Sequence, residues 1–273
     1  MAESPSSAVE PRAAASVILV RDAKPGAPEP TEVYMIRRKR DMKFLGGFYA
    51  FPGGKVDPGD VATAVPARCH GLSAADAARC FVSPEALPPL AFWVAAVREL
   101  LEESGVLLAC DGAGGVVDPR EPRVGARADA ARQALVGNGA DFGALLAERG
   151  WRCDLRPLRY LSHFVTPKTS PIRFTARFFL CRLPPGQTPR LYTEETSEGF
   201  WIQPGVGYRR FLAKEMAMAE PAEYGLAYIA QFRSVDELWG ACDDNREKFT
   251  GIVDRIEFKF WKDFDWGAGR WSR

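Results

Sequence analysis

Three glutamates in the stretch "VRELLEESGV" (97–106) have a spacing that could support chemistry. Glu99, Glu102 and Glu103 stand at positions i, i+3 and i+4, so on a helix their carboxylates lie on one face. Like charges at this spacing repel one another, and the helix needs cations to offset them. Carboxylate oxygens are the ligands that a hard divalent cation such as Mg²⁺ takes in proteins. The spacing indicates either a metal site or an acidic helix surface that faces solvent.

A second stretch, "FPGGKVDPGD" (51–60), contains groups that would complement a metal site. Gly54 and the glycine before it leave backbone carbonyls open to a ligand, because no side chain shields them. Lys55 supplies a cation for a phosphate, and Asp60 adds a carboxylate that could anchor Arg98. Two stretches far apart in the sequence are therefore candidates for one site.

Together the two stretches resemble the Nudix box, G-x5-E-x7-R-E-U-x-E-E-x-G-U, where U is a bulky aliphatic residue. Gly54 would open the box. Its second half is filled without a mismatch by Arg98, Glu99, Leu100, Glu102, Glu103, Gly105 and Val106. The chain departs from the box in having Asp60 for the first glutamate and residues 61–97 in place of the seven-residue spacer. Because the box forms a loop–helix–loop, such an insertion can bulge outward, and we expect one split site.

The resemblance implies hydrolysis of a phosphoanhydride bond in a nucleoside diphosphate linked to another group, with Mg²⁺ or Mn²⁺ as cofactor. It implies that Glu102 and Glu103 are metal ligands and that Glu99 is a ligand or the general base. Arg98, one turn from Glu102, would orient a glutamate rather than touch substrate. The backbone of Gly54 is a further candidate ligand.

An acidic residue near the end of "EETSEGFW" (194–201) is a candidate for the same metals. Many Nudix proteins place a carboxylate near this point, and Glu198 is the residue that we expect to fill that role. The alternative is that Glu198 is a plain surface acid.

A basic run in residues 37–43 could receive a phosphate of the substrate; it consists of Arg37, Arg38, Lys39, Arg40 and Lys43. The upstream motif of coenzyme A-directed Nudix enzymes runs roughly L-L-T-x-R-S/A-x3-R-x3-G-x3-F-P-G-G. Arg38, Gly47 and residues 51–54 match it, and Lys43 stands where the second arginine would be. Departures from it are Tyr34, Met35, Ile36 and Lys39. Arg38, Lys43 and Lys55 are the candidate substrate-binding residues, and a solubilising charge run is the alternative.

The long spacer resembles the eukaryotic peroxisomal coenzyme A diphosphatase branch, as do "TPKTSPIRFTARFFLC" (166–181) and "PAEYGLAYIAQFRSVDEL" (221–238). The expected substrate is coenzyme A or acyl-coenzyme A, giving 3′,5′-ADP and a 4′-phosphopantetheine product. One alternative is a Nudix pyrophosphatase acting on ADP-ribose, NADH or a dinucleoside polyphosphate. The other, of a different class, is a non-catalytic module that senses nucleotides.

Periodicity places these residues on elements of a mixed α/β fold. Apolar residues recur around one face of residues 91–106, which predicts a helix that stops at Gly105. The resemblance implies an α/β/α sandwich with a mixed sheet, formed by one domain over residues 15–273. Residues 1–14 are expected to be a disordered lead-in, 61–90 an insertion, and about 206–273 a helical C-terminal extension.

Composition supports an ordinary globular protein, with 47% hydrophobic residues, 26% charged residues and a net charge of +1. Such a charge gives no general reason to bind nucleic acid or a membrane surface, so the expected partner is a small-molecule nucleotide. Six cysteines without a C-x-x-C pair, and no secretory signal pattern, favour a cytoplasmic protein with reduced thiols. A homodimer is left open.

Overall fold

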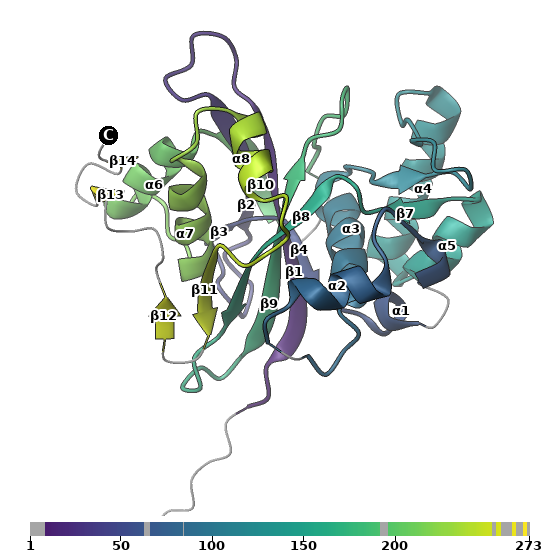
Figure 1. Cartoon of the computed structure of the whole chain (residues 1–273), viewed down its shortest axis with the longest axis horizontal. Helices are drawn as coiled ribbons and strands as arrows, with labels where there is room; N and C mark the ends of the chain where they lie inside the picture. Colours follow the sequence, from purple (N-terminus) through teal and green to yellow (C-terminus); the bar gives the residue numbers. More distant parts are fainter. Residues whose placement is uncertain are drawn as a thin grey trace, which may run out of the picture.

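The fold is built on one large mixed sheet. The computed structural model describes residues 9–62, 66–83, 85–191, 196–252, 255–257, 264–265 and 270–271. Within them a nine-stranded sheet has the order β10-β2-β1-β9-β8-β11-β12, with β3 paired to β2 and β4 paired to β1 (Figure 1). Its strands are β1 (Arg12–Asp22), β2 (Thr31–Arg38), β3 (Tyr49–Ala50), β4 (Gly53–Lys55), β8 (Leu158–Val165), β9 (Phe174–Arg182), β10 (Thr196–Ile202), β11 (Phe249–Ile252) and β12 (Arg255–Glu257). The β1–β9 and β8–β11 pairs are parallel, and the other pairs are antiparallel.

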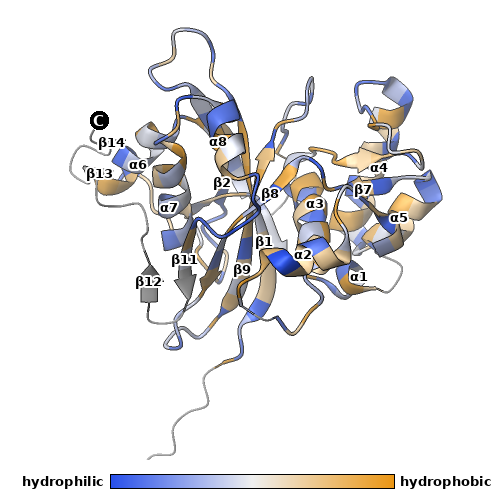
Figure 2. Cartoon of the chain, in the orientation of Figure 1, coloured by the Kyte–Doolittle hydropathy of each residue, from blue (hydrophilic) through white to orange (hydrophobic). Residues whose placement is uncertain are grey.

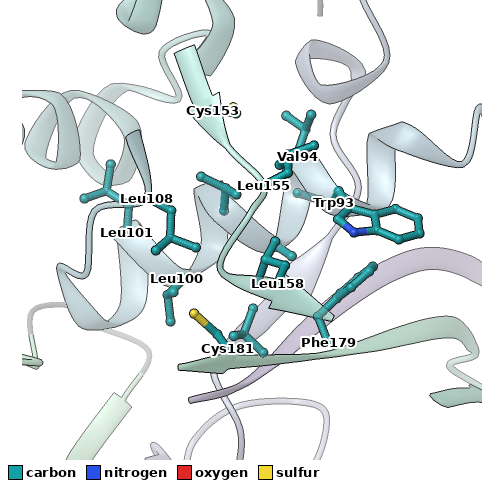
Figure 3. Close-up of a cluster of buried hydrophobic side chains, with 14 of the residues drawn as sticks. Trp93, Val94, Leu100, Leu101, Leu108, Cys153, Leu155, Leu158, Phe179 and Cys181 are labelled. Atoms are coloured by element: carbon teal, nitrogen blue, oxygen red, sulfur yellow. The ribbon is translucent and has the colours of Figure 1, made fainter. Parts of the chain in front are cut away.

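One face of the sheet is covered by α3 (Leu90–Ser104), the helix that carries the three glutamates. Trp93 and Leu100 of this helix are buried against Phe179 and Cys181 of β9, as Figure 3 shows, and the Trp93 and Phe179 rings lie 4.8 Å apart. The helix ends where Gly105 adopts a left-handed backbone conformation, φ 69°, and donates its N–H to the carbonyl of Leu101. The predicted helix and its glycine stop are confirmed.

The opposite face is covered by α6 (Pro204–Leu212), α7 (Glu220–Ile229) and α8 (Val235–Ala241). Successive side chains of β1 alternate between the two cores: Val17 packs in the core beneath α3, and Ile18 packs in the core beneath α7. Figure 2 shows hydrophilic residues at outer turns of α2 and α8, away from these cores. The expected α/β/α sandwich is therefore present.

The insertion within the box belongs to a smaller layer beside α3. Helix α1 (Pro58–Val61) leads into the insertion. The insertion itself contains a 3₁₀ turn (Pro66–Arg68), β5 (Cys69–His70) and α2 (Ala74–Cys80). Strand β5 pairs with β7 (Arg152–Asp154), which also pairs with β6 (Ala109–Cys110), and α4 (Pro122–Asn138) and α5 (Phe142–Arg149) complete the layer. The insertion therefore packs into the domain instead of only bulging outward.

Two of the expected boundaries change. Strand β1 begins at Arg12, so residues 12–14 of the expected lead-in are strand, held by parallel pairing with β9. The C-terminal extension is helical only as far as Ala241, because β11 then joins the sheet beside β8 and buries Phe249. In the described part of the chain, no helix combines the length and apolar character needed to cross a bilayer.

Candidate active site

The two halves of the box meet through Arg98, which is buried with only 5% of its side chain exposed. Its Nε lies 3.0 Å from Oδ1 of Asp60, and its Nη2 lies 2.8 Å from Oδ2 of the same carboxylate. Nη2 also donates to the carbonyl oxygen of Lys55 at 2.7 Å. The loop half is therefore fixed to the helix half at three points, and the sequence-based expectation that Asp60 anchors Arg98 is confirmed.

The remaining guanidinium nitrogen of Arg98, Nη1, donates hydrogen bonds to two of the glutamates. Nη1 lies 2.9 Å from Oε1 of Glu99 and 3.0 Å from Oε1 of Glu102, one turn further along α3. Charge-assisted hydrogen bonds of this kind are stronger and more directional than neutral ones. Arg98 therefore holds two carboxylates side by side and offsets their repulsion.

Gly54 approaches Glu99 so closely that any side chain at position 54 would displace the Glu99 carboxylate. A Cβ at position 54 would stand 2.4 Å from Oε1 of Glu99, far inside a normal contact. Strand β4 reaches this position by pairing with β1, which sets Gly54 opposite Ala15. Gly54 therefore allows the backbone of β4 to approach the Glu99 carboxylate closely. Unlike Gly105, it does not adopt a left-handed backbone conformation.

Glu103 holds the same loop from its other side. Its Oε2 accepts a hydrogen bond of 2.7 Å from the backbone N–H of Gly53, and the side chain is buried. A lone buried carboxylate is costly unless donors reach it, and this amide is one such donor. Glu99, Glu102 and Glu103 thus all lie against the glycine loop or the arginine that secures it.

Burial of these acids disfavours their charged forms. It raises the pKa of Glu99 to about 8, with Arg98 opposing the shift and Glu102 adding to it. Burial also raises the pKa of Glu102, and again the Arg98 charge opposes this. For Arg98 burial alone would lower the pKa, but its hydrogen bond to Asp60 and the charges of Glu99 and Asp60 outweigh it and raise the pKa. The cluster holds more acid than its arginine can neutralise.

The donor set fits a hard divalent cation. Glu99, Glu102 and Glu103 offer oxygen ligands only, and two of the carboxylates already gather around one positive group. Among the described residues, however, no three acidic, histidine or cysteine side chains converge closely enough to enclose an ion. Glu103 is directed to the Gly53 amide, whereas Glu99 and Glu102 face Arg98.

Glu198 contacts a basic residue, and its role as a metal ligand stays a prediction. Its Oε1 forms an ion pair of 2.8 Å with Nη1 of Arg37, opposite it on β2. Alternation along β10 puts Glu198 on the same face as Phe200, which packs in the core beneath α6 and α7, and α3 covers the other face. Glu198 therefore leaves β10 on the sheet face opposite the one that α3 covers.

The basic run lies at the same end of the sheet as the glycine loop. Because β1 and β2 are antiparallel, the end of β2 lies beside the start of β1, where β4 pairs. An open cavity of about 460 Å³ is lined there by Arg37, Lys39, Arg40, Asp41, Ser197 and Glu198. Arg38 alternates with Ile36 onto the face covered by α3, and its Nε donates to the carbonyl of Phe44.

The side chains of the two candidate lysines, Lys43 and Lys55, are both exposed. Lys43 is exposed in the loop between β2 and β3. Lys55 is also exposed, and alternation along β4 turns its side chain away from the face that Gly54 presents to Glu99. Only the backbone carbonyl of Lys55 takes part in the cluster.

Sequence reasoning missed a second buried arginine, Arg132 of α4, whose Nε donates to the carbonyl oxygen of Glu102 at 2.9 Å. The available signal was its position among Ala128, Ala131 and Leu135, since these residues form the buried face of α4. An arginine on such a face needs a buried acceptor.

Comparisons with known proteins show the family of the chain. Residues 11–229 match the sequence model of the NUDT19 Nudix domain. The human acyl-coenzyme A diphosphatase NUDT19 is 28% identical, with 85% of this chain and 72% of that protein covered. The chicken protein of the same name is also 28% identical, over 83% of this chain and 70% of that protein.

A solved structure is similar as well. The NUDIX hydrolase from Alicyclobacillus acidocaldarius superposes with a TM-score of 0.66 and 31% sequence identity, over 83% of this chain and 94% of that chain. The match of the family spans both halves of the split box and the arginine that joins them. The chain therefore belongs to the Nudix hydrolases and, among them, to the family of the NUDT19 Nudix domain.

Proposed function

We propose that this protein hydrolyses a phosphoanhydride bond in coenzyme A or acyl-coenzyme A with the help of Mg²⁺ or Mn²⁺. The observation that carries the hydrolase part is the contact of Gly54 and Arg98 with Glu99, which brings the two distant halves of the box together. The coenzyme A part is supported by the relatives named acyl-coenzyme A diphosphatase. The products would be 3′,5′-ADP and a 4′-phosphopantetheine that keeps any acyl group.

In the reaction, the oxygen of a water forms a bond to one phosphorus, and the bridging oxygen leaves with the other phosphate. A divalent ion would be held by Glu102 and Glu103, with Glu99 or the Gly54 carbonyl as further ligands, and would supply charge neutralisation and Lewis acidity. The proton of the water passes to a carboxylate, and Glu99 is the candidate because burial raises its pKa, which makes its ionised form a stronger base. Arg98 keeps Glu99 and Glu102 oriented throughout.

The cationic end of the sheet is the candidate site for the substrate's remaining phosphates. Arg38 is the strongest candidate, since it shares a sheet face with α3 and is half buried. The neighbouring cavity adds Lys39 and Arg40, whose charges suit a nucleotide phosphate. Of the departures from the coenzyme A motif, Tyr34, Met35 and Ile36 are buried in the sheet, whereas Lys39 lines this cavity.

A substrate panel tests the proposal. Coenzyme A, acetyl- and longer acyl-coenzyme A, ADP-ribose, NADH and a dinucleoside polyphosphate are incubated with Mg²⁺ or Mn²⁺, and products are identified by mass. Release of 3′,5′-ADP from the coenzyme A compounds alone is the expected result. Preference for another compound would keep the hydrolase and replace the substrate. Nucleotide binding without metal-dependent turnover of any compound would favour the non-catalytic module.

A further inference from the structure

Arg132 reaches the active-site helix from outside the box. It lies on α4, only 1% of it is exposed, and it is one of the largest fully buried side chains. Its Nε donates to the carbonyl oxygen of Glu102 at 2.9 Å, and its Nη2 donates to the carbonyl oxygen of Arg190 at 3.0 Å. One guanidinium thus bridges the last turn of α3 and the segment that precedes β10.

That segment also binds the end of α3 directly. The N–H of Arg190 donates to the carbonyl oxygen of Ser104 at 2.8 Å. Nη1 of Arg132 would lie only 2.8 Å from a Cβ placed on Gly105, so the guanidinium fits against the turn that ends the helix. Carbonyl oxygens at a helix C-terminus lack partners within the helix and carry partial negative charge, so a cation there is favourable.

The charge of Arg132 acts on the hydroxyl of Tyr34, and so does the charge of Glu103. Burial raises the pKa of Tyr34, the Arg132 charge opposes this shift, and the Glu103 charge adds to it, so Arg132 and Glu103 both act on one hydroxyl. The acidic helix is therefore flanked by two buried arginines. Arg98 binds the carboxylates of Glu99 and Glu102, and Arg132 binds the backbone of Glu102.

We propose that Arg132 is a positioning residue for the divalent-metal site: by binding the backbone carbonyl of Glu102 it fixes the last turn of α3, the turn that carries Glu102 and Glu103. This inference rests on the proposed function. The backbone of Glu102 would shift if its carbonyl lost this partner, and a shift of the backbone moves the carboxylate with it. Loss of such outer partners of metal ligands typically weakens metal affinity by about 10- to 100-fold.

The test measures Mn²⁺ binding directly, by electron paramagnetic resonance and calorimetry on the full chain, beside thermal unfolding. The variants are Arg132→Met and Arg132→Lys. The matched control is Arg149→Met on α5, whose guanidinium hydrogen-bonds the backbone carbonyls of Leu145 and Arg127. We expect Arg132→Met to raise the Kd for Mn²⁺ about tenfold or more and to lower kcat more than it changes KM. Arg132→Lys should recover part of the affinity.

The outcomes separate the two proposals. Should Arg149→Met lose thermal stability to a similar degree and keep wild-type Mn²⁺ affinity, the effect of Arg132→Met belongs to the metal site. If Arg132→Met binds Mn²⁺ as the wild type does, the positioning role is overturned and the proposed function stands. If Arg132→Met does not fold, Arg132→Lys decides, because unchanged affinity in that variant together with its loss of one carbonyl contact would overturn the inference. A wild-type protein that binds no Mn²⁺ would overturn the proposed function itself.

Discussion

Arg98 binds both carboxylate oxygens of Asp60 although 38 residues separate them, with 3.0 Å from Nε to Oδ1 and 2.8 Å from Nη2 to Oδ2. Both side chains are almost fully buried. Asp60 is itself fixed, because its Oδ2 accepts the backbone N–H of Asp57 at 2.8 Å in a capping box that begins α1. This contact explains how the two halves of the box stay together although the spacer is replaced. The Asp60 and Arg98 side chains join the loop to α3 directly, so the length of the chain between them does not matter.

The most direct prediction concerns Glu102. Glu102→Gln keeps the size of the side chain and one hydrogen bond to Arg98, but it removes a negative charge from the metal site. We expect kcat to fall by at least about 10²-fold, which corresponds to about 2.7 kcal/mol of transition-state stabilisation, with the fold retained. Steady-state kinetics and circular dichroism check this. Glu148→Gln, on an exposed side chain of α5, is the control and should keep full activity. Near-normal turnover in Glu102→Gln would sink the assignment.

The helix half of the site was predictable from sequence because its information is local. The spacing of Glu99, Glu102 and Glu103 fixes a common helix face, and Gly105 marks where the helix ends. The ion pair between Asp60 and Arg98 was also predictable from the sequence, because residues of opposite charge stand at two positions of the box pattern. These features depend on residue type and on spacing along one element.

The parts that sequence reasoning missed depend on pairing between distant strands and helices. The ion pair of Glu198 with Arg37 depends on the pairing of β10 with β2, which places the two residues opposite each other. The approach of α4 that brings Arg132 to Glu102 has no signal in either stretch of the box. Likewise β11 pairs with β8 from far along the chain, and no local pattern in residues 249–252 indicates that partner.

Gly54→Ala should separate activity from stability. The new methyl group would meet the carboxylate of Glu99, the end of a flexible side chain that can move aside at small cost. We therefore expect a loss of turnover of about 10²-fold, since the displaced Glu99 leaves Arg98 and the metal site. Unfolding in urea should change by less than about 1 kcal/mol.

The control for this change is Gly240→Ala on α8, where a Cβ would meet nothing within 4 Å. That variant should keep full activity. If Gly54→Ala is as active as Gly240→Ala, the close approach of the glycine loop to Glu99 has no role in catalysis.

Glu85→Gln should loosen the insertion. Glu85 lies between α2 and α3, and its Oε1 accepts from Nε of Arg177 at 2.9 Å, in a contact that is nearly buried. Arg177 is fully buried and also pairs with Glu247, so removing the Glu85 charge leaves part of its compensation in place. We expect a loss of about 2 kcal/mol in the free energy of unfolding, typical of a hydrogen bond to a charged group.

Urea unfolding measures this loss, and limited proteolysis locates it, with faster cleavage expected within residues 61–90. The exposed Glu148→Gln serves again as the control and should unfold and digest like the wild type. Equal cleavage rates in Glu85→Gln and the control would show that this ion pair does not secure the insertion.

The stability of the protein should also fall on mild acidification because of His163. This side chain is buried on β8, its Nε2 lies 2.7 Å from Oγ1 of Thr175, and burial together with the charge of Arg177 lowers its pKa to about 3. In the unfolded chain the histidine keeps a pKa near 6.5. Between pH 6.5 and about 3 the unfolded chain therefore binds a proton at His163 that the folded protein does not bind. The neutral histidine therefore contributes stability that is present above pH 6.5 and lost as pH falls toward 3. Between pH 6.5 and 5.5 the loss is about 1 kcal/mol.

Urea unfolding of the wild type and of His163→Gln at both pH values checks this loss of stability. The wild type should lose about 1 kcal/mol more than the variant, and equal losses would show that another group sets the acid sensitivity.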